Sequence, residues 1–169
     1  MVPSSFDEAE VPPELDPADH VRYSSLMKAR GVAAKCPQSL VVAADTIVVV
    51  DDLILGKPKD PEDAAGMLAK LGGRTHQVYS GIAVAANGVE RSAVECTDVT
   101  FSPLTNEIIT RYVATGEPLD KAGAYAIQGR GAVLISSVNG CYFNVVGLPI
   151  HRLSKLLEEF GIVPLNTDE

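Results

Sequence analysis

The sequence predicts a single domain of the mixed α/β class over residues 1–169. Apolar runs rich in β-branched residues alternate with amphipathic segments of helical period, which is the pattern of an α/β fold. Asn-Gly pairs at 87–88 and 139–140 are typical of β-hairpins, so the strands are not all parallel. We expect about five or six strands and four helices, with no internal repeat.

The first strand is predicted from Leu40 to Val50, because β-branched residues dominate it and no turn former interrupts it. Asp45 breaks this apolar pattern in mid-strand, with Thr46 beside it. Burying a carboxylate is costly unless a cation or several donors meet it. Asp45 is therefore either a functional acid or a core aspartate satisfied by its neighbours.

A constrained loop follows this strand, after a turn at Asp51-Asp52. Gly56 permits tight backbone geometry, and Pro58 stiffens the residue after Lys57. The turn can bring Lys57 to the same end of the sheet as Asp45. The alternative is an unrelated surface lysine, and on this stretch alone the two interpretations are about even.

Helix signals precede and follow the first strand. Asp16 before Pro17 predicts a helix start, with the helix running to about Ala34 and carrying Lys28, which by itself indicates only a solvated helix lysine. Asp60 before Pro61 predicts a second helix. The Gly72-Gly73 pair ends that helix.

The second half begins with a predicted hairpin of two strands, 78–86 and 89–101. A third helix is expected from about 103 to 115, and a last amphipathic helix from about 147 to 160. Between them we expect strands at 132–138 and 142–146, joined by a hairpin at Asn139-Gly140.

A dense segment from Gly116 to Gly131 combines glycines with many different polar groups. Glycines let a backbone run close beneath a ligand, so this segment indicates a site, the alternative being an ordinary long connection.

Composition excludes several classes of function. A formal charge of −8 argues against general binding to nucleic acid or to an anionic membrane. Three cysteines show no metal-binding spacing, which favours reduced thiols in a cytoplasmic protein. No signal peptide or membrane-spanning run is present in the sequence.

Several short motifs together resemble the Maf family of nucleotide pyrophosphatases. They occur in the family's order and spacing across nearly the whole chain, and as a set they are highly specific. These motifs are Ala44-Asp45-Thr46, Gly56-Lys57-Pro58, Gly73-Arg74-Thr75-His76 with Val78, Gly116-Glu117-Pro118 with Asp120-Lys121-Ala122-Gly123-Ala124-Tyr125, Ile127-Gln128-Gly129 and Val145-Val146-Gly147-Leu148-Pro149.

The resemblance implies a fold similar to the inosine triphosphate pyrophosphatases: an elongated mixed sheet flanked by helices, with a central cleft between two lobes. It also implies hydrolysis of a nucleoside triphosphate to the monophosphate and pyrophosphate. A divalent metal, Mg²⁺ or alternatively Mn²⁺, and a homodimer are implied as well.

The family's catalytic acids fall on Glu8 and Asp45, which we expect to hold the metal or its water. Its lysines fall on Lys28 and Lys57, which would bind the triphosphate as point charges.

The threonine at position 46 and the glutamine at position 128 resemble those of the branch of the family that acts on dTTP, UTP and related pyrimidine nucleotides. We expect Thr46 and Gln128 to bind the base or sugar. Asp120 and Lys121 form either a structural ion pair or a second metal and phosphate contact, the structural role being favoured. His76 is interpreted as scaffold.

One departure from the family is large. Its members carry a strand and a Ser-x-Ser-Pro-Arg-Arg loop before the acidic pair, whereas Asp7-Glu8 lies near the start of this sequence. Either the natural start lies upstream of Met1, or the chain is trimmed, or this is a degenerate relative. A chain without these phosphate donors would be a catalytically impaired nucleotide-binding or regulatory protein of the same fold, which is the alternative interpretation. A different metal-dependent phosphohydrolase ranks third.

Overall fold

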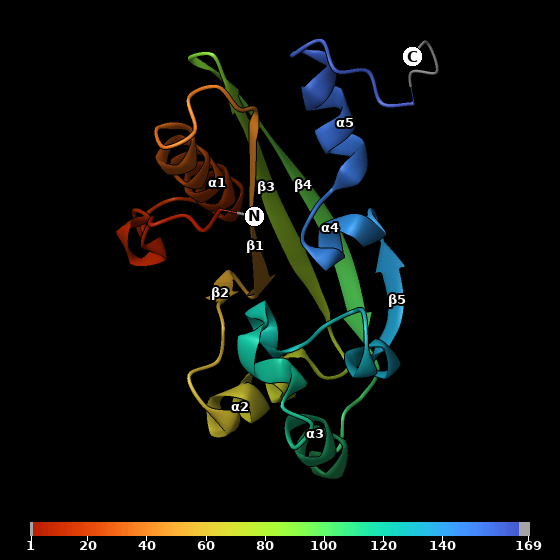
Figure 1. Ribbon diagram of the computed structural model, residues 1–169. Coiled ribbons are helices and arrows are strands. Elements are labelled where there is room, and N and C mark those ends of the chain that lie inside the picture. Colours follow the sequence, from red (N-terminus) through yellow and green to blue (C-terminus); the bar gives the residue numbers. More distant parts are fainter. Residues whose placement is uncertain (1, 166–169) are drawn as a thin grey trace. The chain divides into compact units, whose positions relative to one another are not determined.

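The computed structural model describes residues 2–165 and confirms the α/β class. The elements alternate along the chain as the apolar periodicity predicts (Figure 1). The helices and strands are α1 (Pro17–Ala33), β1 (Val41–Val50), β2 (Leu53–Leu55), α2 (Pro61–Leu71), β3 (Thr75–Ala86), β4 (Val89–Phe101), α3 (Asn106–Val113), β5 (Ile135–Asn139), α4 (Tyr142–Val146) and α5 (Ile150–Glu158). The short 3₁₀ turns are η1 (Glu8–Glu10), η2 (Glu117–Asp120), η3 (Ala122–Ala124) and η4 (Arg130–Leu134).

The strands form one five-stranded sheet in the order β2-β1-β3-β4-β5. The pair β1–β2 is antiparallel, with Val48 opposite Leu55, and the pair β4–β5 is antiparallel, with Val99 opposite Val138. The predicted hairpin at 87–88 connects β3 to β4. The sequence predicted a mixed sheet. In the structure the strand pairs β1–β2 and β4–β5 are antiparallel.

The described chain divides into two compact units. Of the described residues, one unit contains 2–45, 80–95 and 147–165, and the other contains Thr46–Tyr79 and Cys96–Val146. We call them the α1 unit and the α2 unit after the helices that they contain. The long strands β1, β3 and β4 contribute residues to both.

In the α1 unit, β3 buries alternate residues against two different helices. Ala83 and Ala85 pack with Ala29 of α1, whereas Ile82 and Val84 pack with Leu156 of α5. Successive side chains of a strand point to opposite faces, so α1 and α5 cover the two faces of this part of the sheet (Figure 1).

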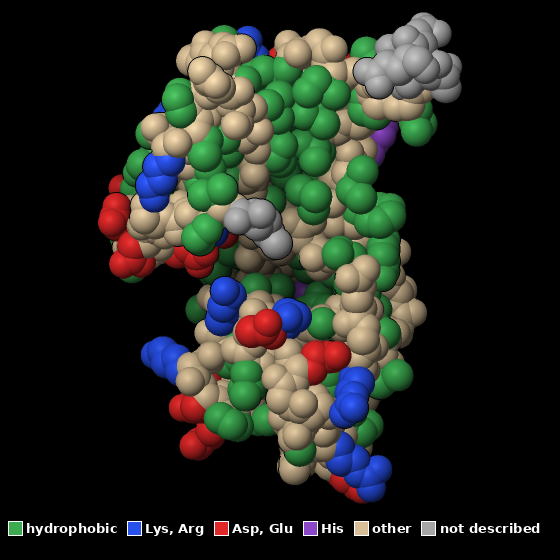
Figure 2. Space-filling model, viewed as in Figure 1, with side chains coloured by type: hydrophobic (Ala, Val, Ile, Leu, Met, Phe, Trp, Pro, Cys, Tyr) green, Lys and Arg blue, Asp and Glu red, His purple; other side chains and the backbone are tan. Residues whose placement is uncertain are grey.

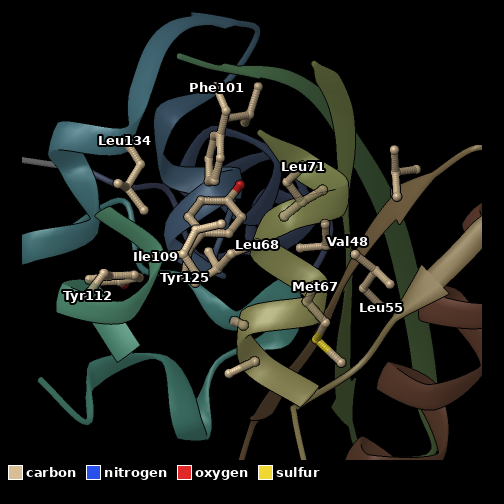
Figure 3. Close-up of a cluster of buried hydrophobic side chains, with 14 of the residues drawn as sticks. Val48, Leu55, Met67, Leu68, Leu71, Phe101, Ile109, Tyr112, Tyr125 and Leu134 are labelled. Atoms are coloured by element: carbon tan, nitrogen blue, oxygen red, sulfur yellow. The ribbon is translucent and has the colours of Figure 1, made fainter. Parts of the chain in front are cut away.

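The α2 unit has a separate, larger core. Leu68 and Leu71 of α2 pack with Phe101 of β4 and with Tyr125, and Val48 of β1 lies in the same cluster (Figure 3). The Asp60 carboxylate caps α2 by accepting a hydrogen bond from Asp63 N at 2.8 Å, as predicted.

Two predictions near the end of the chain are wrong. Tyr142–Val146 forms the helix α4 and not a strand, and no hairpin occurs at Asn139-Gly140. Gly140 instead lies against Thr97, where a Cβ atom would come 2.9 Å from its Oγ1. The glycine at position 140 therefore reflects the close approach of the backbone to Thr97, and not a hairpin turn.

Among the residues that the structure describes, no helix is long and apolar enough to cross a lipid bilayer.

Candidate active site

The α1 unit brings together three of the predicted site residues: Glu8, Lys28 and Asp45. The Nζ atom of Lys28 donates to Glu8 Oε1 at 2.6 Å and to Asp45 Oδ1 at 2.6 Å. The Asp45 side chain is 9% exposed and that of Glu8 is 59% exposed. We call these three residues the acid–lysine triad. The triad joins a buried carboxylate to a solvent-exposed one through a single ammonium group.

Each member of the triad is fixed by its own element. Asp45 lies in the middle of β1, and Lys28 lies in α1, whose first turn is capped by the Asp16 carboxylate accepting from Asp19 N at 2.8 Å. Glu8 begins η1, where the Asp7 carboxylate accepts from Ala9 N at 2.9 Å. The capping residues therefore determine the backbone from which the charged side chains project.

A glycine lets α1 approach the sheet. A Cβ atom at Gly81 of β3 would lie 2.1 Å from the carbonyl oxygen of Val21 in α1. Only glycine fits at such a separation, and small buried residues on the same helix, Ser25 and Ala29, keep the layers close. This packing carries α1, and with it Lys28, close to the sheet.

The electrostatics of the triad favour a charged lysine. Burial lowers the pKa of Lys28, but hydrogen bonds and charge interactions with Asp45 and Glu8 outweigh burial and raise the pKa above its ordinary value. Two carboxylates and one ammonium leave a formal charge of −1. This excess of negative charge favours a further cation at the triad.

The other predicted site residues lie in the α2 unit. Thr46 follows Asp45 in β1 and is half-buried, while Lys57 and Gln128 are exposed. Within this unit the loop that carries Lys57 is tied to the η2–η3 segment, because Gly123 N donates to Gly56 O at 3.0 Å. A Cβ atom at Gly123 would lie 2.8 Å from the side chain of Val48.

The Lys57 loop and the η2–η3 segment form a second charged group. Asp120 accepts from Lys121 Nζ at 2.7 Å. The hydrogen bond from Lys121 lowers the pKa of Asp120, and the charge of Lys57 contributes to the same shift. Figure 2 shows basic side chains on both sides of acidic ones where this segment lies in Figure 1. Asp120 and Lys121 thus form an ion pair, and Lys57 is an electrostatic neighbour of Asp120. The structural role that the sequence favours for this pair stays a prediction.

His76 is buried scaffold. Its Nε2 lies 2.8 Å from the Tyr125 hydroxyl, and its ring packs edge-on against Phe101 and Tyr125. Burial lowers the pKa of His76 to about 4, so the imidazole is neutral at physiological pH. The interpretation of His76 as scaffold agrees with this environment.

The sequence did not predict that the Glu117 carboxylate binds the backbone of residues 130 and 131. Glu117 Oε1 accepts from Arg130 N at 3.0 Å and Oε2 accepts from Gly131 N at 2.8 Å. Its position in a Gly-Glu-Pro motif was the only signal, and spacing alone does not show that the chain returns to it 14 residues later.

This fold, with two acids on one lysine and further lysines on glycine-bounded loops, defines a small α/β protein whose charged residues suit a phosphorylated ligand. The chain belongs to the family described as Maf-like protein, whose family model matches residues 1–160. The resemblance drawn from the motifs is thereby confirmed.

Curated relatives cover most of this chain. It is 54% identical over 162 residues to the dTTP/UTP pyrophosphatase of Moorella thermoacetica, covering 95% of this chain and 83% of that protein. The dTTP/UTP pyrophosphatase of Symbiobacterium thermophilum is 53% identical over 145 residues, with 86% and 75% covered. That of Bacillus pumilus is 45% identical over 163 residues, with 96% and 86% covered.

Proposed function

We propose that the protein is a nucleoside triphosphate pyrophosphatase that hydrolyses dTTP and UTP to the monophosphate and pyrophosphate. The observation that carries the proposal is the acid–lysine triad, in which a buried strand aspartate shares one lysine with an exposed glutamate. The relatives named dTTP/UTP pyrophosphatase, at 45–54% identity, support the same reaction and the same nucleotides.

The proposed division of labour follows from charge and position. Either carboxylate of the triad can accept the proton of the attacking water, since carboxylates serve as general bases, and Lys28 holds both of them in one place. Lys28 and Lys57 bind phosphate oxygens as point charges, which offsets the negative charge of the chain as a whole. Thr46 and Gln128 hydrogen-bond the base or sugar, because polar contacts discriminate nucleotides without net charge.

We propose Mg²⁺ as the cofactor, with Mn²⁺ as a substitute of similar ligand preference, held by Asp45 and Glu8. The donor set fits, because Mg²⁺ is bound through one or two carboxylates together with phosphate oxygens and water. No group of three or more His, Cys, Asp or Glu residues suited to a metal occurs in the described part of the chain, so phosphate and water would supply the other ligands. Such a metal stabilises negative charge on the phosphates when bound.

Three further features of the proposal stay predictions. The structure shows no disulfide among the described cysteines at 36, 96 and 141, which supports the proposal of a cytoplasmic protein. A homodimer is supported by the family resemblance. The absence of nucleic-acid or membrane binding is supported by the formal net charge of −8. Light scattering on the purified chain would measure its oligomeric state.

The experiment is product analysis on a panel of dTTP, UTP, dCTP, dATP and dGTP with and without Mg²⁺. We expect monophosphate and pyrophosphate in equal amounts, with dTTP and UTP preferred and with no release in excess chelator. Nucleotide binding without pyrophosphate release would instead support a binding or regulatory protein. Release of orthophosphate would support a different phosphohydrolase.

A further inference from the structure

Gln128 is an exposed residue of a short connection that leads into the start of η4 in the α2 unit. We call residues 126–131 the 126–131 loop. Ile127 beside Gln128 is buried, so the loop is anchored to the core on one side. An exposed amide can select between bases only if its backbone is held in place, because loose positioning loses the discrimination. Two side chains, Tyr112 and Glu117, hold this loop.

Backbone amides on the two sides of the loop donate hydrogen bonds to different side chains, Tyr112 on one side and Glu117 on the other. On the first side, Ala126 N donates to the Tyr112 hydroxyl at 3.2 Å. On the second side, Arg130 N and Gly131 N donate to the two carboxylate oxygens of Glu117 at 3.0 Å and 2.8 Å. Both ends of the loop are therefore bound to side chains from one short stretch, the end of α3 and the start of η2.

Tyr112 and Glu117 also act on each other electrostatically. Burial and the neighbouring Glu117 carboxylate raise the pKa of Tyr112, so its hydroxyl keeps its proton. Burial raises the pKa of Glu117, but interactions with Arg130 N, Tyr112 and Gly131 N outweigh it and lower the pKa overall. The pair consequently keeps the protonation states that its hydrogen bonds require.

The loop contains two glycines that make this arrangement sterically feasible. A Cβ atom at Gly129, whose φ is +100°, would lie 2.3 Å from Glu117 Oε1. A Cβ atom at Gly131 would lie 2.4 Å from Ala126 O and 2.6 Å from the Tyr112 hydroxyl. The glycines on the far side of Gln128 thus leave room for the carboxylate and the phenol.

We propose that Tyr112 and Glu117 are positioning residues for nucleotide selectivity, which fix the 126–131 loop so that Gln128 meets the base in one orientation. The inference rests on the proposed pyrophosphatase function and adds to it two residues that do not themselves contact the nucleotide. Weakening either residue should change which nucleotide is preferred more than it changes folding.

The test measures kcat/KM for dTTP, dCTP and dATP in Glu117→Gln and Tyr112→Phe. Glu107→Gln is the matched control, since Glu107 forms an exposed ion pair with Arg111 at 2.6 Å in the same unit. Tyr142→Phe is the control for loss of a hydroxyl. We expect the preference for dTTP to fall about tenfold in both test variants and to be unchanged in both controls.

A mutant cycle with Gln128→Ala separates positioning from general loosening. If Glu117 acts through Gln128, Glu117→Gln should change selectivity in the native background and have no further effect in the Gln128→Ala background. Faster hydrogen exchange at the amides of Arg130 and Gly131 should accompany the loss. Should Glu117→Gln not fold, Tyr112→Phe provides the same cycle.

Unchanged selectivity in both test variants, or an equal effect with and without Gln128, overturns the inference while leaving the pyrophosphatase activity in place. A wild-type chain that releases pyrophosphate from none of the nucleotides overturns the proposed function, and the inference with it.

Discussion

Lys28 has a structural task and a proposed catalytic one at once. It neutralises most of the charge that a buried Asp45 brings into β1, and it holds Glu8 at the same Nζ atom. Breaking a buried pair by removing one partner leaves an uncompensated charge, which is far more costly than losing an exposed pair.

Lys28→Met should therefore lower the free energy of unfolding by about 3 kcal/mol, because Asp45 loses its cation while the methylene packing is retained. Urea unfolding measures this change. Lys155→Met is the matched control, since Lys155 pairs with Glu158 at 2.9 Å on the exposed face of α5, and it should cost less than about 1 kcal/mol. Equal losses in the two variants would contradict the role given to Lys28.

His76 makes the stability depend on pH. Its pKa is lowered by burial to about 4, against an ordinary value of about 6.5 in the unfolded chain. The unfolded state therefore binds more protons between these values, and stability should fall as the pH falls through this window, by roughly 3 kcal/mol in total. Urea unfolding at pH values from 7.5 to 4.5 would measure the slope.

The variant His76→Gln has no titrating group at this position. Its unfolding free energy should vary much less with pH over the same range. An equally steep slope in this variant would show that other groups, and not His76, produce the acid sensitivity.

At this scale the sequence predicted the acid but not its partner. Asp45 stands out because a carboxylate interrupts an apolar strand, whereas Lys28 looks like any solvated helix lysine. The pairing joins residues 17 positions apart and exists only because α1 packs against the sheet. No local pattern contains that information.

The contact between α1 and β3 is the element-scale feature on which the triad depends. A Cβ atom added at Gly81 of β3 would lie 2.1 Å from the carbonyl oxygen of Val21 in α1. Backbone atoms cannot move aside as a flexible side chain can, so a larger residue must displace the helix.

Gly81→Ala should destabilise the protein by about 3 kcal/mol or more and reduce turnover together with stability. Gly31→Ala is the control, because an added Cβ there meets only Ser4 Oγ at 3.9 Å. Since Gly31 lies inside α1, that change should stabilise the chain by about 0.5–1 kcal/mol. Denaturant unfolding of both variants checks the opposite signs.

Element prediction failed where tertiary contacts outweighed local propensity. Tyr142–Val146 has the aromatic and β-branched residues of a strand, yet it forms α4. In that helix the buried Asn144 Nδ2 donates to Val78 O of β3 at 2.8 Å and to Thr97 Oγ1 of β4 at 3.0 Å, so these two hydrogen bonds tie α4 to two strands. The helices whose ends carry Asp-Pro signals, α1 and α2, were predicted to within about one residue.

At the scale of the whole molecule, the residues proposed to act are divided between the two compact units. The acid–lysine triad belongs to the α1 unit, while Thr46, Lys57 and Gln128 belong to the α2 unit. Each unit has its own hydrophobic core, so a substitution in one core can be used to separate general destabilisation from a local effect in the other.

The central claim is that the buried charge at position 45 is needed for hydrolysis. Asp45→Asn keeps the shape of the side chain and removes its charge, while Lys28 retains Glu8 as a partner. Asp52→Asn is the matched control, because Asp52 is an exposed turn residue with φ of +61° that asparagine tolerates equally well.

The decisive measurement is pyrophosphate release from dTTP by the wild-type chain, Asp45→Asn and Asp52→Asn, with the unfolding midpoint of each determined in parallel. We predict that Asp45→Asn loses turnover by about a hundredfold or more with a near-normal midpoint, and that Asp52→Asn keeps full activity. Full turnover by a folded Asp45→Asn variant would contradict the account.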